Sequence, residues 1–262
     1  MFDRYLITII YSLLFVLMGC KFKSSPYVSR TPSTLRNESN LKAIKDQELA
    51  TGSDFKIALI SDTHNYYDEL NQLVKAINRN GPYAFVIVTG DISNFGLLEE
   101  YQETSYYLDQ LNSPSLVVVG NHDLLSKGNI IFKRMFGQSN LSFVYKNAHF
   151  IFFNNNNWET AGLVPDRPFV ESALMASASP IKLVLAHVAP DDRDRFADTA
   201  IAEWEALMTT YNVDYFINGH NHNPTEGVFG NATQLTVGAP TKGSYYELLI
   251  SAGGVTHQKI SF

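Results

Sequence analysis

Short apolar runs alternate with amphipathic segments over most of the chain. From Phe55 onward, strand-like runs such as FKIALIS, YAFVIVTG and SLVVVG are separated by stretches with apolar residues at helical spacing, for example Leu70, Leu73, Val74 and Ile77. Strands that alternate with helices in this way predict βαβ crossovers and a mainly parallel sheet at the start of the domain.

The alternation of strands and helices continues into the second half of the chain and ends after His222. SFVYK and HFIFFN predict a hairpin around Asn147, and helical patterns follow near 168–178 and 195–211. After His222 there are strand-like runs without helices, separated by Gly and Asn turns: EGVFG, ATQLTVG, SYYELLIS and VTHQKISF. We therefore expect a second, antiparallel sheet packed on the first.

The first 54 residues differ from the rest of the chain in composition and in hydrophobic pattern. Residues 5–18 form an uncharged run that is shorter than the ~20 residues of a transmembrane helix and is typical of a secretory signal peptide. Residues 21–54 hold nine Ser or Thr, two Pro and scattered charges without a sustained apolar period. This composition favours a flexible tether, with a short helix over 41–49.

Composition limits the classes of function. With 45% apolar residues among 262, the chain can bury a sizeable core. Its 20 Lys and Arg against 26 Asp and Glu give a net charge of −6, so we expect no bulk nucleic-acid binding. The single cysteine, Cys20, excludes an intrachain disulfide and a Cys-rich zinc site, so any metal must be held by His, Asp, Glu or Asn.

Polar clusters follow five of the predicted strands. In open α/β sheets ligands bind at the carboxyl ends of strands, so these clusters are expected to converge on one crevice. Carboxylate, imidazole and amide oxygen without thiolate suit Zn, Mn or Fe(II), and Asp-x-His or His-x-His on extended backbone can chelate one ion. The clusters are Asp62-Thr63-His64, Gly90-Asp91, Gly120-Asn121-His122-Asp123, His187 and Gly219-His220-Asn221-His222.

In order and type, these motifs resemble the whole motif set of the calcineurin-like metallophosphoesterases. The matching region runs from about Phe55 to the C-terminus. Each motif alone is a weak signal, whereas five in the same order are very specific. The resemblance implies one α/β domain over residues 55–262, built from two packed mixed β-sheets flanked by helices in an αββα sandwich.

The resemblance also implies residue roles around two divalent metal ions (Mn, Zn or Fe). His122 would face the scissile phosphate, and Asp123 would either support His122 or be an ordinary turn carboxylate. Asn94 stands where purple acid phosphatases carry an iron-ligating tyrosine, which disfavours a coloured Fe(III) site. One ion would lie on Asp62, His64, Asp91 and His222, and the other on Asp91, Asn121, His187 and His220, with Asp91 as the bridge.

The function implied is hydrolysis of a small phosphate monoester or diester. A hydroxide held between the ions would attack phosphorus while His122 assists the leaving oxygen. The alternative is a catalytically inactive, metallophosphoesterase-like lipoprotein that acts as a binding module. Outside the motifs, the asparagine run 154–157 is expected to close a strand, although one amide could reach substrate. Four basic residues that follow the motifs could contact a phosphate, although we expect them at the solvated surface: Lys127, Arg134, Arg193 and Arg195.

Leu17-Met18-Gly19-Cys20 resembles the lipobox of bacterial lipoproteins. It implies a signal peptide over 1–19, a lipidated Cys20 that opens the tether over 20–54, and a cell-envelope protein held in a bacterial membrane by its N-terminal lipid. The alternatives are an uncleaved signal anchor or a chance cysteine. Substrate identity, physiological metals and oligomeric state stay open.

Overall fold

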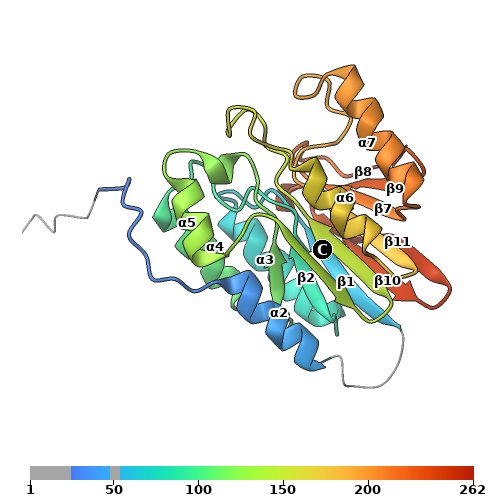
Figure 1. Cartoon of the computed structure of the whole chain (residues 1–262). Helices are drawn as coiled ribbons and strands as arrows, with labels where there is room; N and C mark the ends of the chain where they lie inside the picture. Colours follow the sequence, from blue (N-terminus) through green and yellow to red (C-terminus); the bar gives the residue numbers. More distant parts are fainter. Residues whose placement is uncertain (1–24, 48–53) are drawn as a thin grey trace, which may run out of the picture.

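The structure is a computed structural model that describes residues 25–47 and 54–262 (Figure 1). The predicted signal peptide and Cys20 lie outside the described residues. Within these two ranges, none of the helices combines the length and the apolar character needed to span a bilayer.

Two mixed β-sheets form the centre of the fold. In the first sheet, in the order β11-β10-β1-β2-β3, the three strands β1 to β3 are parallel and β10 is antiparallel to β1. Its strands are β1 (Phe55–Ile60), β2 (Phe85–Val88), β3 (Ser115–Val117), β10 (Ser244–Ser251) and β11 (Gly254–Ser261).

In the second sheet, in the order β4-β5-β6-β7-β9-β8, the four central strands are parallel and both edge strands are antiparallel. Its strands are β4 (Leu141–Tyr145), β5 (Ala148–Phe152), β6 (Ile181–Leu185), β7 (Tyr215–Asn218), β8 (Thr225–Phe229) and β9 (Ala232–Thr236).

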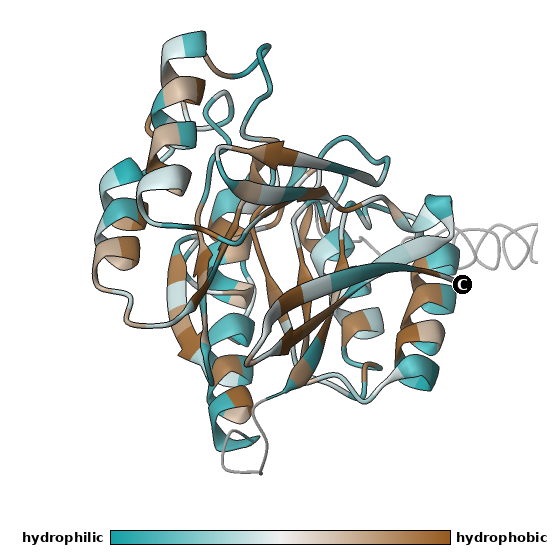
Figure 2. Ribbon diagram, turned by 90° about the vertical axis from the view of Figure 1, so that its right-hand side faces the viewer, coloured by the Kyte–Doolittle hydropathy of each residue, from teal (hydrophilic) through white to brown (hydrophobic). Residues whose placement is uncertain are grey.

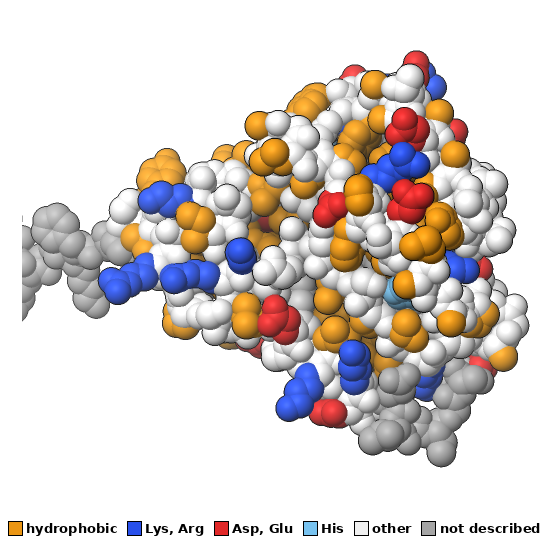
Figure 3. Space-filling model, in the orientation of Figure 1, with side chains coloured by type: hydrophobic (Ala, Val, Ile, Leu, Met, Phe, Trp, Pro, Cys, Tyr) orange, Lys and Arg blue, Asp and Glu red, His pale blue; other side chains and the backbone are white. Residues whose placement is uncertain are grey.

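Helices cover the outer faces of both sheets, and their outward sides carry the charged side chains visible in Figure 3. The first sheet is covered by α3, α4 and α5, and the second by α6 and α7. The helices are α2 (Arg36–Gln47), α3 (Tyr67–Asn80), α4 (Leu98–Leu108), α5 (Gly128–Met135), α6 (Arg167–Met175) and α7 (Asp198–Thr210), with short 3₁₀ turns η1 (His122–Leu124) and η2 (Pro240–Lys242).

The predicted fold class and the alternation of strands and helices are confirmed, with one correction to the C-terminal strands. They do not form a separate antiparallel sheet. Instead β8 and β9 extend the second sheet, and β10 and β11 extend the first. The reason is that β1 pairs with β10 and β7 pairs with β9. Without these partners, the backbone N–H and C=O groups on one side of β1 and of β7 would lack hydrogen bonds.

The period-two pattern of the strands separates three apolar layers. In β1, Ile57 and Leu59 lie in the core between the two sheets, whereas Ala58 and Ile60 pack against the helices. A third cluster joins the second sheet to α6 and α7. Figure 2 shows the result as apolar strands between helices with polar outer sides. Such burial on both faces makes the sheets a rigid platform for the loops at their ends.

The segment predicted as a flexible tether contains the ordered helix α2, which includes residues 41–47 of the short helix expected over 41–49 and begins five residues earlier, at Arg36. The amide of Asn37 donates to Val117 O and accepts from Val117 N, both at 2.8 Å, and Asn40 donates to Ser115 O. Ile44 is buried in the core between the sheets. The hydrophobic pattern misses the first turn of this helix and its attachment to the domain, because side-chain hydrogen bonds to edge strand β3 hold it more than an apolar stripe does.

Candidate metal centre

All the predicted ligands lie where strands of the two sheets end. Asp62 and Asp91 follow β1 and β2 of the first sheet, whereas His187 and His220 follow β6 and β7 of the second. Because the carboxyl ends of these parallel strands meet at one edge of the sandwich, residues from both halves of the chain come together there.

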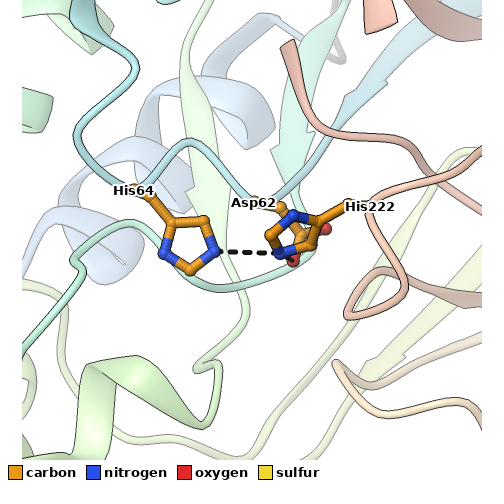
Figure 4. Close-up of side chains that lie close together, drawn as sticks. All are labelled: Asp62, His64 and His222. Atoms are coloured by element: carbon orange, nitrogen blue, oxygen red, sulfur yellow. Dashed lines mark hydrogen bonds and ion pairs between the residues drawn. The ribbon is translucent and has the colours of Figure 1, made fainter. Parts of the chain in front are cut away.

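The first ligand group consists of Asp62, His64 and His222 (Figure 4). The Nε2 atoms of His64 and His222 are 3.2 Å apart, and His222 Nε2 lies 3.6 Å from Asp62 Oδ1. Two imidazole nitrogens at this separation can both reach one ion at roughly 2.1 Å, with an angle of about 100° between them. The first sheet supplies Asp62 and His64, and the second supplies His222.

The second ligand group consists of Asp91, His187 and His220. Asn121 Oδ1 lies 2.9 Å from His220 Nδ1 and 3.1 Å from His187 Nε2, and that nitrogen lies 3.1 Å from Asp91 Oδ2. Two nitrogens and two oxygens therefore face one point, in agreement with the set predicted for the second ion.

Asp91 lies between the two groups. Its Oδ2 is 3.1 Å from His187 Nε2 in the second group and 3.6 Å from His64 Nε2 in the first. Its Oδ1 accepts a hydrogen bond from the backbone N–H of His122 at 2.9 Å. This is the placement that a carboxylate shared by two ions requires.

The backbone is strained where the ligands lie. Five predicted ligands have positive φ angles: Asp62 at 50°, His64 at 40°, Asp91 at 52°, His220 at 71° and His222 at 58°. Each such non-glycine residue costs on the order of 1–3 kcal/mol, and strain of this kind clusters at functional sites. The residues around the ligands are also tightly packed. Gly90 has a φ angle of 106°, and a Cβ added to it would collide with the His187 ring.

Burial controls the charges in the centre. It raises the pKa of Asp62 to about 7 and lowers the pKa values of His64 and His220 to about 4. Although burial opposes both effects, the Asp91–His187 ion pair holds the pKa of Asp91 below its ordinary range and raises the pKa of His187 to about 9. Neutral imidazoles beside buried carboxylates suit a cation, and the donor set of these residues therefore fits divalent metal ions.

Contacts on the outer side of two histidine ligands, His187 and His220, orient their rings. His187 Nδ1 donates to Thr89 O at 2.8 Å, which leaves Nε2 facing the centre. His220 Nε2 lies 3.9 Å from a carboxylate oxygen of Asp192, while Nδ1 faces Asn121. Such outer contacts select the tautomer of a metal-binding histidine.

His122 borders the first ligand group without belonging to it. Its Nδ1 donates to Asn94 O at 2.7 Å, and its ring lies edge-on to that of His64, with centroids 4.8 Å apart. Because a carbonyl oxygen can only accept, Nδ1 carries the proton and Nε2 is the ring atom able to exchange one.

Asp123 does not support the imidazole of His122, which corrects one of the two roles expected for it. Its Oδ1 accepts from both N and Oγ of Ser93 at 2.9 Å, and its Oδ2 accepts from Gly120 N at 2.8 Å. The buried carboxylate thus joins the loops after β2 and β3. Asp123 is a positioning residue for the loops that carry Asp91 and Asn121.

The asparagine run after β5 has a role that sequence reasoning missed. Asn155 bonds both backbone groups of Val188, next to His187, and Asn156 donates to Val119 O, just before Gly120. These amides support the backbone of the ligand loops instead of reaching outward. The signal in the sequence is the clustering of asparagines directly after a strand, where side-chain amides replace missing ladder partners.

A sequence model of the calcineurin-like phosphoesterase family matches residues 55–224. The chain belongs to this family, and the two ligand groups are those of a metallophosphoesterase. A probable cyclic nucleotide phosphodiesterase of Rhodopseudomonas palustris is 29% identical over 203 residues, which cover 66% of this chain and 74% of the relative.

A second relative and a solved structure extend the likeness. A probable cyclic nucleotide phosphodiesterase of Coxiella burnetii is 26% identical over 189 residues, covering 64% of this chain and 76% of the relative. A dimetal phosphatase of Danio rerio superposes with a TM-score of 0.62 at 14% identity, over 79% of this chain and 99% of that one. This structural likeness shows the fold alone.

Proposed function

We propose that this protein hydrolyses small phosphodiesters with two divalent metal ions, and that cyclic nucleotides are its substrate class. The observation that carries the proposal is the pair of adjacent ligand groups, with Asp91 between them. The names of the two relatives support cyclic nucleotides as the substrate class.

Some of these residues would bind the ions, and others hold the loops that carry the ligands. When bound, the ions would lower the pKa of water and neutralise charge on the phosphoryl oxygens. Asp62, His64 and His222 would hold one ion, and Asn121, His187 and His220 the other, with Asp91 shared. Their rigid loops, fixed by Asp123, Asn155 and Asn156, keep the donors in place before substrate arrives, which lowers the reorganisation needed during the reaction.

We propose that His122 acts on the leaving oxygen. Asn94 O holds its Nδ1–H, so a proton can be delivered from Nε2 when the ring is charged. In a cyclic nucleotide the leaving group is a ribose hydroxyl, which departs poorly as an alkoxide. Proton donation to this oxygen is therefore worth more for a cyclic nucleotide than for an aryl ester, whose leaving group is less basic.

The test is a substrate screen of the full chain reconstituted with Mn²⁺ or Zn²⁺. We expect metal-dependent hydrolysis of 3′,5′-cyclic nucleotides, with slower turnover of nucleoside monophosphates and sugar phosphates. A protein that binds two ions but hydrolyses none of these esters would overturn the proposal and support the inactive binding module instead. EDTA treatment and metal re-addition control for contaminating phosphatases.

We also propose that the protein is exported and held at a bacterial membrane by lipid on Cys20. The uncharged run over 5–18 and the lipobox-like string that ends in Cys20 support this proposal. Stable anchoring requires more than one acyl chain. Cys20→Ala should release the protein from the membrane fraction or leave an uncleaved precursor, and mass spectrometry that finds an unmodified Cys20 in membranes would contradict the proposal.

A further inference from the structure

A tryptophan on the loop between β5 and α6 is unusually exposed. Trp158 has 60% of its surface accessible, whereas the other tryptophan, Trp204, is buried and stacks on Phe153. Among the ring contacts of the described residues, no aromatic ring stacks on Trp158, and the Arg195 guanidinium lies over it at 4.4 Å from the ring centroid. An indole left in water forgoes a large burial energy, so its exposure needs a reason.

Arg195 holds the indole in a fixed plane. The Arg195 side chain is 7% exposed and forms an ion pair with Glu159 at 2.7 Å. A buried, paired guanidinium over an aromatic face gives a cation–π contact that a mobile surface arginine would not maintain. The expectation that Arg195 is solvated is therefore wrong, and since its charge is neutralised by Glu159 it is not free to bind a phosphate.

The loop that carries Trp158 and the loop that carries Arg195 are both connected to the metal centre. Residues just before Trp158 are bonded to the ligand loops, because Asn155 contacts Val188 and the Asn157 amide donates to Arg195 O at 2.6 Å. Arg195 ends the turn that begins at Asp192, whose carboxylate lies 3.9 Å from His220 Nε2. Figure 1 shows both loops on the upper edge of the molecule, beyond the strands that lead to the centre.

We propose that Trp158 is a stacking platform for the nucleobase of the substrate, and that Arg195 and Glu159 fix its orientation. This inference rests on the proposed function and adds a base-binding subsite to it. With one face of the indole covered by the guanidinium, the rest is open to a planar ring. A phosphodiester held at the metal centre carries its base away from the ions, and the indole, which is linked to His220 of the second ligand group through Arg195 and Asp192, is the aromatic ring we expect to receive it.

Steady-state kinetics on 3′,5′-cyclic AMP test the platform. Trp158→Ala should raise KM about fivefold or more with little change in kcat, as expected for loss of base stacking, and Trp158→Phe should restore much of the affinity. Tyr106→Ala is the matched control, since Tyr106 is 62% exposed but lies near the end of α4, away from the ligand loops. A Trp158→Ala enzyme with wild-type KM would overturn the platform while leaving the proposed function intact.

A binding measurement separates the platform from turnover. In a Trp204→Phe background Trp158 is the one remaining indole, and 5′-AMP should quench its fluorescence whereas ribose 5-phosphate, which lacks the base, should not. Equal quenching by both, or by neither, would overturn the platform. Absence of cyclic nucleotide hydrolysis by the wild-type protein, with base-dependent quenching retained, would overturn the proposed substrate class but support the nucleotide subsite.

Discussion

Three side chains of the metal centre have neighbours that set their charge or direction. Thr89 O orients His187, Asn94 O orients His122, and Asp91 receives contacts from both ligand groups. Single substitutions should therefore separate residues that bind an ion from residues that hold a ligand loop in place.

Asp91→Ala should abolish activity and remove at least one ion, because Asp91 Oδ2 lies within 3.6 Å of an imidazole nitrogen in each of the two groups. Elemental analysis of the purified variant measures this directly, and two retained ions would contradict the assignment. Asp123→Asn is the control. It should keep both ions and lose about 10- to 100-fold in activity, since Asp123 acts through the loops.

His122→Ala should damage hydrolysis of alkyl phosphodiesters more than that of nitrophenyl esters. General acid assistance is worth on the order of 10²- to 10⁴-fold, and a nitrophenolate leaves without much help. Comparing kcat/KM for the two ester classes provides the measurement, with metal content unchanged. Equal losses on both would assign His122 to phosphate binding instead.

Metal uptake should release protons. In the metal-free protein burial raises the pKa of Asp62 to about 7, and the charge of Asp91 raises the pKa of His187 to about 9 despite burial. A cation must displace these protons, so affinity for Mn²⁺ should increase as the pH rises through about 7 towards about 9. Titration calorimetry in buffers of different ionisation enthalpy counts the protons, and a pH-independent affinity would refute the expectation.

At the scale of elements, α2 shows how a polar helix becomes part of a domain. Its contacts with β3 use Asn37, Asn40 and Arg36, and Arg36 also pairs with Asp109 at 2.7 Å. By covering β3, the helix removes an open edge at which another chain could add a strand.

Asn37→Ala should lower the free energy of unfolding by about 1–3 kcal/mol, because it leaves the buried N–H and C=O of Val117 without their partner. Urea denaturation measures the loss. Lys42→Ala, an exposed change on the same helix, should have little effect. Hydrolysis by folded Asn37→Ala protein should be normal, since α2 contributes no ligand.

The strand ends and the Asp and His residues that gather in the two groups could be located from the sequence because apolar runs stop sharply at residues such as Asp62 and Asp91. Two features of the structure could not be predicted from the sequence. The first turn of helix α2 and its attachment to β3 depend on amide hydrogen bonds that leave no periodic pattern, and the Trp158–Arg195 contact joins two loops whose approach depends on how β5 and β6 pair. Which sheet each C-terminal strand joins likewise depends on long-range pairing.

At the scale of the whole molecule, each ligand group takes residues from both sheets. The first combines Asp62 and His64 with His222, and the second combines Asp91 with His187 and His220. Bound ions would therefore connect the two halves of the sandwich at one edge, in addition to the apolar core between them.

Mn²⁺ should raise the unfolding temperature of the protein. A ligand at 100 times its Kd stabilises the folded state by about 2.7 kcal/mol per site, which corresponds to roughly 5–10 °C for a domain of this size. Thermal scans with Mn²⁺ and with EDTA provide the comparison. His222→Ala should reduce the shift, and an identical shift in that variant would show that Mn²⁺ acts elsewhere.

The place of β10 in the first sheet determines when the chain can fold. Residues 244–251 pair with β1, almost two hundred positions earlier, with Tyr246 opposite Leu59 and Ile250 opposite Phe55. A chain synthesised as far as residue 243 thus has β1 with one side unpaired and lacks the strand that completes its sheet. Since such distant pairing forms slowly, the first sheet can be completed only after residue 251 has been synthesised, whereas every strand of the second sheet ends before residue 237.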